Sequence, residues 1–79
     1  MKIKVRYFAL FRDQTGCASE SVDCEVETAA GLFQLMAEKH VSLKTEAAAL
    51  VAINDEMTGW ETRLSEGDEV LFFPPVAGG

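Results

Sequence analysis

The chain has few residues of the kinds that form metal centres and disulfide crosslinks. Its 79 residues include two cysteines and one histidine, and the two cysteines are not arranged as CxxC. No second histidine or second cysteine pair is present to complete a typical zinc-ligand set. We therefore expect no metal site, and we expect Cys17 and Cys24 to be reduced thiols. His40 should interact with the last carbonyl groups of a helix.

The sequence also lacks a long hydrophobic run and is poor in basic residues. No apolar segment approaches the roughly 18 residues of a membrane-spanning helix, and residues 1–6 alternate instead of forming a signal-peptide core. Seven Lys and Arg against 13 Asp and Glu give a net charge of −6, which disfavours binding to nucleic acid and to anionic membranes. These features predict a cytoplasmic protein with a basic protein partner, no nucleic acid and no membrane.

No internal repeat, linker or low-complexity stretch interrupts the chain. Its 48% hydrophobic and 25% charged residues are typical of a globular domain. A chain of this length cannot divide its core between two domains. We expect one domain over residues 1–75, followed by a flexible Gly-Gly tail at residues 76–79.

Period-two alternation predicts the main strands. Apolar residues alternate with basic ones over residues 2–7, and with acidic or polar ones over residues 21–26. The acidic and basic outer faces of these two strands should pair across an antiparallel ladder. Residues 50–53 should form a strand buried on both faces, residues 56–58 a short edge strand, and residues 69–73 a final strand that ends at Pro74.

Helical spacing predicts one main helix. Leu32, Leu35 and Met36 form an apolar stripe, Thr28 is a suitable N-cap, and the helix should run to about His40. Residues 12–16 are typical of a short helical turn closed by a glycine, and residues 45–49 of one further turn. One helix across a mixed sheet of four to five strands predicts an α+β fold. With the first and last strands parallel at the centre, it is a β-grasp, or ubiquitin-like, roll.

The chain offers no credible catalytic set of its own. Neither a Ser-His-Asp nor a Cys-His arrangement has suitable spacing, and no GxxxxGK phosphate-binding loop occurs. Four acidic residues are interpreted as solvated turn residues, with docking to a basic partner as the alternative: Asp13, Glu66, Asp68 and Glu69.

The sequence ends in an apolar strand, two prolines and two glycines. Glycine has no Cβ, so a Gly78-Gly79 end passes through a channel that a larger residue would block. Pro74 and Pro75 stiffen the chain before it. This combination is typical of a tail that is presented to another protein, although a plain structural domain with a disordered end remains an alternative.

Three blocks of the sequence resemble the small subunit of molybdopterin synthase, a ubiquitin-like sulfur carrier family. They are residues 3–9 with Arg12, residues 51–54, and residues 67–70 followed by Phe73-Pro74-Pro75-Val76-Ala77-Gly78-Gly79. The last block is the most specific, and the resemblance extends over essentially the full length. Residues 56–60 match the family pattern less well.

The resemblance implies chemistry at the terminal carboxylate of Gly79. An E1-like adenylyltransferase would adenylate this carboxylate with ATP and magnesium, and a persulfide sulfur would convert it to a thiocarboxylate. The tail, comprising Pro74, Pro75, Val76, Ala77 and Gly78, would then insert into the large synthase subunit. The sulfur would be delivered there to cyclic pyranopterin monophosphate. The chain itself would bind no cofactor and would be a non-catalytic subunit of a heterotetramer.

Two related functions remain open. The thiamine-biosynthesis sulfur carrier shares the fold and the Gly-Gly end but usually lacks the preceding Pro-Pro, and a ubiquitin-like protein modifier uses the same adenylated terminus. Among the aromatic residues, Phe8 and Phe73 are the candidates for an exposed partner interface, whereas Phe11 and Phe72 are candidates for the core. Trp60 is either a lid on the core or a surface anchor.

Overall fold

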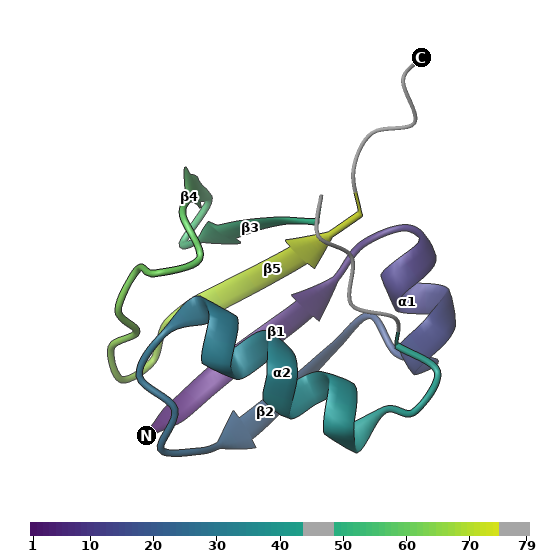
Figure 1. Ribbon diagram of the computed structural model, residues 1–79, viewed down its shortest axis with the longest axis horizontal. Coiled ribbons are helices and arrows are strands. Elements are labelled where there is room, and N and C mark those ends of the chain that lie inside the picture. Colours follow the sequence, from purple (N-terminus) through teal and green to yellow (C-terminus); the bar gives the residue numbers. More distant parts are fainter. Residues whose placement is uncertain (44–48, 75–79) are drawn as a thin grey trace.

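Helices separate the first three strands of the chain, and the last three strands follow one another without a helix between them. The computed structural model describes residues 1–43 and 49–74, and Figure 1 shows how its elements are arranged. In these residues the elements are β1 (Lys2–Tyr7), α1 (Leu10–Thr15), β2 (Ser19–Asp23), α2 (Ala29–Lys39), β3 (Leu50–Ile53), β4 (Glu56–Thr58) and β5 (Glu69–Phe73). Neither described helix is long and apolar enough to cross a membrane.

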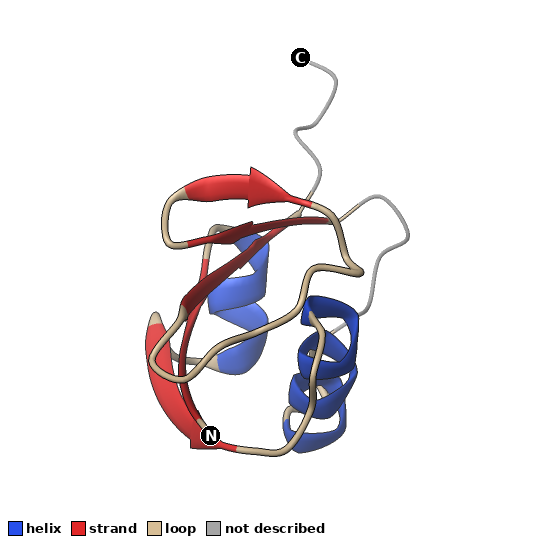
Figure 2. Ribbon diagram, turned by 90° about the vertical axis from the view of Figure 1, so that its left-hand side faces the viewer, coloured by secondary structure: helices blue, strands red, loops and turns tan. Residues whose placement is uncertain are grey.

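The strands form one mixed sheet in the order β2-β1-β5-β3-β4. The first and last strands, β1 and β5, lie side by side in parallel, and every other neighbouring pair is antiparallel. Helix α2 crosses one face of this sheet (Figures 1 and 2). The predicted ubiquitin-like β-grasp fold is therefore confirmed, with α1 as a second, shorter helix.

The core lies between the sheet and the helices. Alternate residues of β1 are buried because they face α2, and so are Val70 and Phe72 of β5. Phe33 of α2 contacts the rings of Phe11 and Phe72, at centroid distances of 5.6 and 4.8 Å. Trp60 stacks on Phe72 and lies 5.1 Å from the Phe33 ring, so it is a lid on the core and not a surface anchor.

The ends of the helices match the expected capping residues. The Oγ1 of Thr28 accepts a hydrogen bond from the Gly31 N–H at 3.2 Å, which satisfies a donor at the start of α2. Helix α1 ends at Gly16, which has a φ of 78° and donates its N–H to the Arg12 carbonyl. A left-handed conformation of this kind favours glycine.

The second strand is displaced from its predicted position. It covers Ser19–Asp23 and not residues 21–26, because its register pairs Asp23 with Lys2, the first residue of β1, and only the hydrogen bonds between Met1 and Cys24 continue the ladder beyond that pair. The predicted ladder of opposite charges is therefore wrong for most of its length, since Lys4 and Arg6 lie opposite serines. Arg6 instead forms an ion pair with Glu69 of β5 at 3.0 Å.

Other expected elements are confirmed or lie outside the described residues. Strands β3, β4 and β5 have the predicted bounds. The extra helical turn expected at residues 45–49 overlaps residues 44–48, which the structure does not describe.

Candidate functional site

The carboxyl ends of β1 and β5 meet at one edge of the sheet. Tyr7 is the register partner of Phe72, and the Phe8 N–H donates to the Phe72 carbonyl at 3.1 Å. On the other side of β5, Leu50 at the start of β3 is paired with Phe73. The chain passes through Pro74 from this edge, so the central strand of the sheet fixes the position from which the tail begins (Figure 1).

Apolar side chains gather on the sheet face opposite α2. Val70 and Phe72 are fully buried toward the helix, so the alternating residues Leu71 and Phe73 belong to the other face. The register extends this face to both neighbours of β5 and to β4. We call the resulting surface the outer patch, and its members are Phe8, Leu50, Met57, Leu71 and Phe73.

The outer patch combines exposed and partly covered residues. Phe8 is 59% exposed and Met57 is 60% exposed, whereas Leu71 and Phe73 are half-buried. The structure therefore brings the two predicted interface residues, Phe8 and Phe73, to one surface. Phe11 and Phe72 are fully buried, as predicted.

Three members of the outer patch, Leu50, Met57 and Leu71, lie outside the interface predicted from the sequence. The strand predicted to be buried on both faces includes Leu50, but this residue is 36% exposed because both helices lie on the other side of β3 (Figure 2). Met57 was seen only as part of a short edge strand. The sequence carries no signal for the exposure of Leu50, because four consecutive apolar residues show no period-two alternation.

Three of the four predicted acidic turn residues hold the turn before β5, at the opposite end of that strand from the tail. Asp68 accepts hydrogen bonds from the Asn54 side chain at 3.0 Å and from the Ser65 N–H at 2.8 Å. Glu66 accepts from the Lys2 N–H at 3.0 Å, and Glu69 pairs with Arg6. Three of the four predicted turn residues thus fix the start of the strand that carries the tail, whereas Asp13 is exposed on α1.

His40 does not have the predicted contact. Its backbone N–H donates to the Met36 carbonyl, but its ring lies against the carboxylate of Glu20, with Nε2 and Oε2 2.5 Å apart. The prediction that the imidazole interacts with the last helix carbonyls is therefore wrong. Folding of β2 beside the end of α2 supplies a stronger, charged partner.

The predicted tail lies almost wholly outside the described residues. Pro74 is described and half-buried, and Pro75, Val76, Ala77, Gly78 and Gly79 are not. Their expected role in a partner channel and the expected chemistry at Gly79 therefore remain predictions.

Comparison with known proteins assigns the chain to a family. The sequence profile of the ThiS family matches residues 5–79. The chain belongs to the ThiS family. Two relatives named molybdopterin synthase sulfur carrier subunit match it over 98% of its length and 99% of theirs. The Escherichia coli protein is 35% identical to this ThiS-family chain, and the Haemophilus influenzae protein is 34% identical.

Solved structures agree with this assignment. A putative molybdopterin converting factor subunit 1 from Pyrococcus furiosus has a TM-score of 0.82 and 30% identity, with 95% of this chain and 98% of that chain covered. The small archaeal modifier protein 1 of Methanosarcina acetivorans has a TM-score of 0.82 and 25% identity, with 99% and 96% covered. Subunit 1 in a complex of subunits 1 and 2 of the Helicobacter pylori molybdopterin-converting factor shares the fold, with a TM-score of 0.68, 23% identity and full coverage of both chains.

Proposed function

We propose that this ThiS-family protein is the sulfur carrier of molybdenum cofactor biosynthesis, acting in the cytoplasm as the small subunit of molybdopterin synthase. The observation that carries the proposal is the match to two sulfur carrier subunits over nearly the whole length of both partners. The Pro-Pro-Val-Ala-Gly-Gly ending supports it, because such a tail enters a narrow channel.

The reactive group in this proposal is the terminal carboxylate of Gly79. A carboxylate is a poor electrophile, so an E1-like adenylyltransferase would first join it to the α-phosphate of ATP, with magnesium, and release pyrophosphate. A persulfide sulfur would then attack the acyl carbon and displace AMP, giving a thiocarboxylate after reductive cleavage of the sulfur–sulfur bond by a thiol. The thiocarboxylate would transfer its sulfur to cyclic pyranopterin monophosphate, so ATP and magnesium are used by the partner and not held by this chain.

The described structure suits a carrier better than a catalyst. Residues 74–79 in extended form reach about 20 Å, which is enough to place a terminal atom inside a neighbouring protein. The outer patch lies beside the start of this tail and offers an apolar docking surface for the large synthase subunit. We propose a heterotetramer in which the large subunits supply the catalytic residues.

The proposal is tested by intact-mass spectrometry. The full chain is incubated with an E1-like adenylyltransferase, ATP, magnesium, a persulfide donor and a thiol reductant. We expect the mass increase that corresponds to exchange of one oxygen for sulfur, and we expect none in a variant that lacks Gly79. An unchanged mass while the same enzyme thiocarboxylates a known sulfur carrier would exclude the proposed role.

Likeness to a small archaeal modifier protein favours protein modification as a second candidate function. The two functions diverge after adenylation, since a modifier forms an isopeptide bond with a lysine and a carrier releases sulfur. Adding the thiocarboxylated chain to a large synthase subunit and cyclic pyranopterin monophosphate should yield molybdopterin. Thiocarboxylation without molybdopterin formation would point instead to the thiamine pathway, and conjugates of higher mass would point to a modifier.

A further inference from the structure

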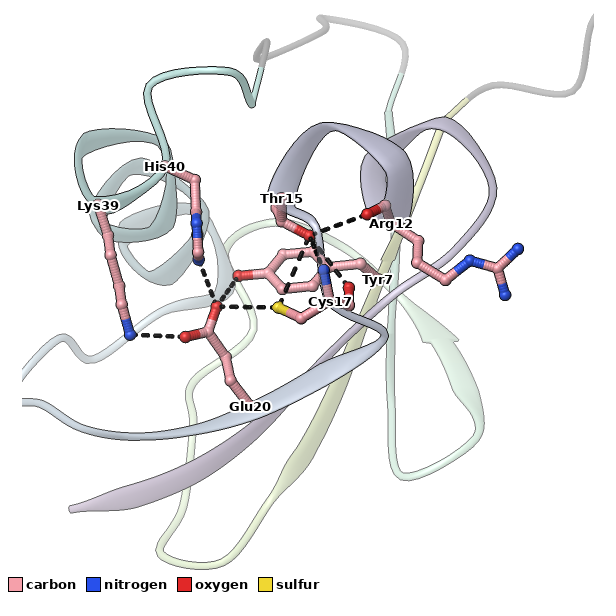
Figure 3. Close-up of polar contacts among 7 residues, drawn as sticks. All are labelled: Tyr7, Arg12, Thr15, Cys17, Glu20, Lys39 and His40. Atoms are coloured by element: carbon pink, nitrogen blue, oxygen red, sulfur yellow. Dashed lines mark hydrogen bonds and ion pairs between the residues drawn. The ribbon is translucent and has the colours of Figure 1, made fainter.

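Three metal-ligand side chains converge at the end of α2. Cys17 comes from the loop after α1 and Glu20, three residues later, from β2; folding brings His40, at the C-terminal end of α2, beside this pair from 20 residues beyond Glu20 (Figure 3). One ligand atom from each residue lies within 4.8 Å of the other two. All three side chains are partly exposed, which leaves the group accessible to an ion from solvent.

Glu20 is ionised and oriented by its neighbours. Its partial burial alone would raise the pKa of the carboxyl group, but hydrogen bonds from Lys39, Tyr7 and His40 outweigh this effect and lower the pKa to about 2. Lys39 donates to Oε1 at 2.6 Å, and the Tyr7 hydroxyl donates to Oε2 at 2.7 Å. Burial, followed by the hydrogen bond to Glu20, raises the pKa of Tyr7, so this hydroxyl stays protonated and acts as a donor.

The other two ligands are also held in place. The His40 ring makes an edge-to-face contact with Tyr7, with ring centroids 5.9 Å apart, and this contact turns Nε2 toward Glu20. The Cys17 N–H donates to the Thr15 hydroxyl at 3.4 Å, and that hydroxyl donates to the Cys17 carbonyl at 3.1 Å. The thiol Sγ lies 4.0 Å from Oε2 of Glu20.

We propose that Cys17, Glu20 and His40 form a binding site for one divalent zinc ion, with water as the fourth ligand. Zinc accepts sulfur, nitrogen and oxygen ligands at about 2.0–2.3 Å in tetrahedral geometry, so neighbouring ligand atoms lie about 3–4 Å apart. The Sγ–Oε2 distance of 4.0 Å is already at that spacing, and the Nε2–Oε2 distance of 2.5 Å must widen. Cys17 binds as thiolate and releases its proton to solvent.

The neighbouring cation does not block the site. The Lys39 ammonium contacts Oε1, so Oε2 binds the ion while Lys39 holds the other oxygen as an outer-shell donor. Its side chain is 52% exposed, and solvent therefore screens its charge from the ion. Counting ligands along the sequence predicts no metal site, because His40 joins Cys17 and Glu20 only when the end of α2 folds beside β2.

The test uses the untagged, full-length, metal-free chain and titration with Co²⁺, followed by competition with Zn²⁺. We expect one equivalent of Co²⁺ to produce a thiolate-to-cobalt charge-transfer band and tetrahedral d–d bands, and Zn²⁺ to abolish both. Zn²⁺ should also raise the Tm by about 5 °C or more at saturation, because an ion bound only to the folded state stabilises it.

Variants of the two thiols decide whether this site is responsible. Cys17→Ala leaves the contacts among Glu20, Lys39 and His40 in place, so it should fold and lose the charge-transfer band. Its zinc affinity should fall by more than the roughly 10–100-fold typical for loss of an outer-shell partner. Cys24→Ala is the matched control, and it should keep the cobalt spectrum. Loss of the spectrum in Cys24→Ala alone, unchanged affinity in Cys17→Ala, or no cobalt bands in the wild-type chain would each overturn the proposal.

Discussion

Glu20 is the residue on which the polar contacts at the end of α2 converge. Its two carboxylate oxygens accept hydrogen bonds from Lys39 and Tyr7 and lie against the His40 ring, so one side chain of β2 connects β1 with α2. Nothing in the sequence alone indicates this role, because Glu20 is one of several acidic residues in a chain of net charge −6. Only the three-dimensional pairing of β2 with β1 distinguishes it from the others.

We expect Glu20→Gln to lower the free energy of unfolding by about 1–2 kcal/mol at neutral pH, because the variant loses a charged hydrogen-bond acceptor. The loss is no larger because solvent partly screens the contacts of this side chain. The folded-state pKa of about 2 lies below the ordinary value of 4.5. The stabilisation is therefore fully present above pH 4.5 and is lost as the pH falls toward 2. Urea unfolding in the presence of a chelator measures the difference between wild type and variant.

The control for this prediction is Glu25→Gln, since Glu25 is an exposed acidic residue near the same strand. It should change the stability by less than about 0.5 kcal/mol. A wild-type advantage over Glu20→Gln that is unchanged between pH 6 and pH 3 would contradict the role assigned to the ionised carboxylate.

Helix α2 is an element whose buried face and N-cap the sequence predicts correctly. Its apolar stripe lies on the sheet, Thr28 caps it, and it ends beside His40, because local capping and helical spacing act within the element itself. Strand β2 was displaced because its bounds depend on how far its partner β1 extends. The sequence predicts the outer patch only in part for a similar reason, since Leu50, Met57 and Leu71 join the predicted interface residues through the register of four strands.

The N-cap of α2 gives a prediction of its own. Thr28→Ala removes the side-chain acceptor of the Gly31 N–H and should cost about 1 kcal/mol. For a domain of this size that cost lowers the Tm by about 4–8 °C, which calorimetry resolves. Thr28→Ser keeps the hydroxyl and should retain most of the stability. Equal losses in the two variants would show that the methyl group of Thr28, and not its hydroxyl, stabilises the helix.

For the molecule as a whole, the two sides of the sheet have different roles. The side covered by α2 holds the aromatic core and the Glu20 contacts, so changes there act on stability. The outer patch lies on the opposite side, where β5 ends and the tail begins. Because Phe8 contributes exposed apolar surface to this patch, binding of a partner is the property that should depend on it.

We therefore expect Phe8→Ala to weaken binding to the large synthase subunit by about tenfold or more, the effect of losing an aromatic contact near the centre of an interface. Its stability should change by less than about 0.5 kcal/mol, because the side chain is 59% exposed. Val41→Ala is the matched control, since Val41 is an apolar residue that is 86% exposed but lies after α2, away from the outer patch. Calorimetric titration of the large subunit with each variant measures the affinities. If Phe8→Ala and Val41→Ala bind equally well, the large subunit does not dock on the outer patch, and the apolar surface beside the tail must serve another partner.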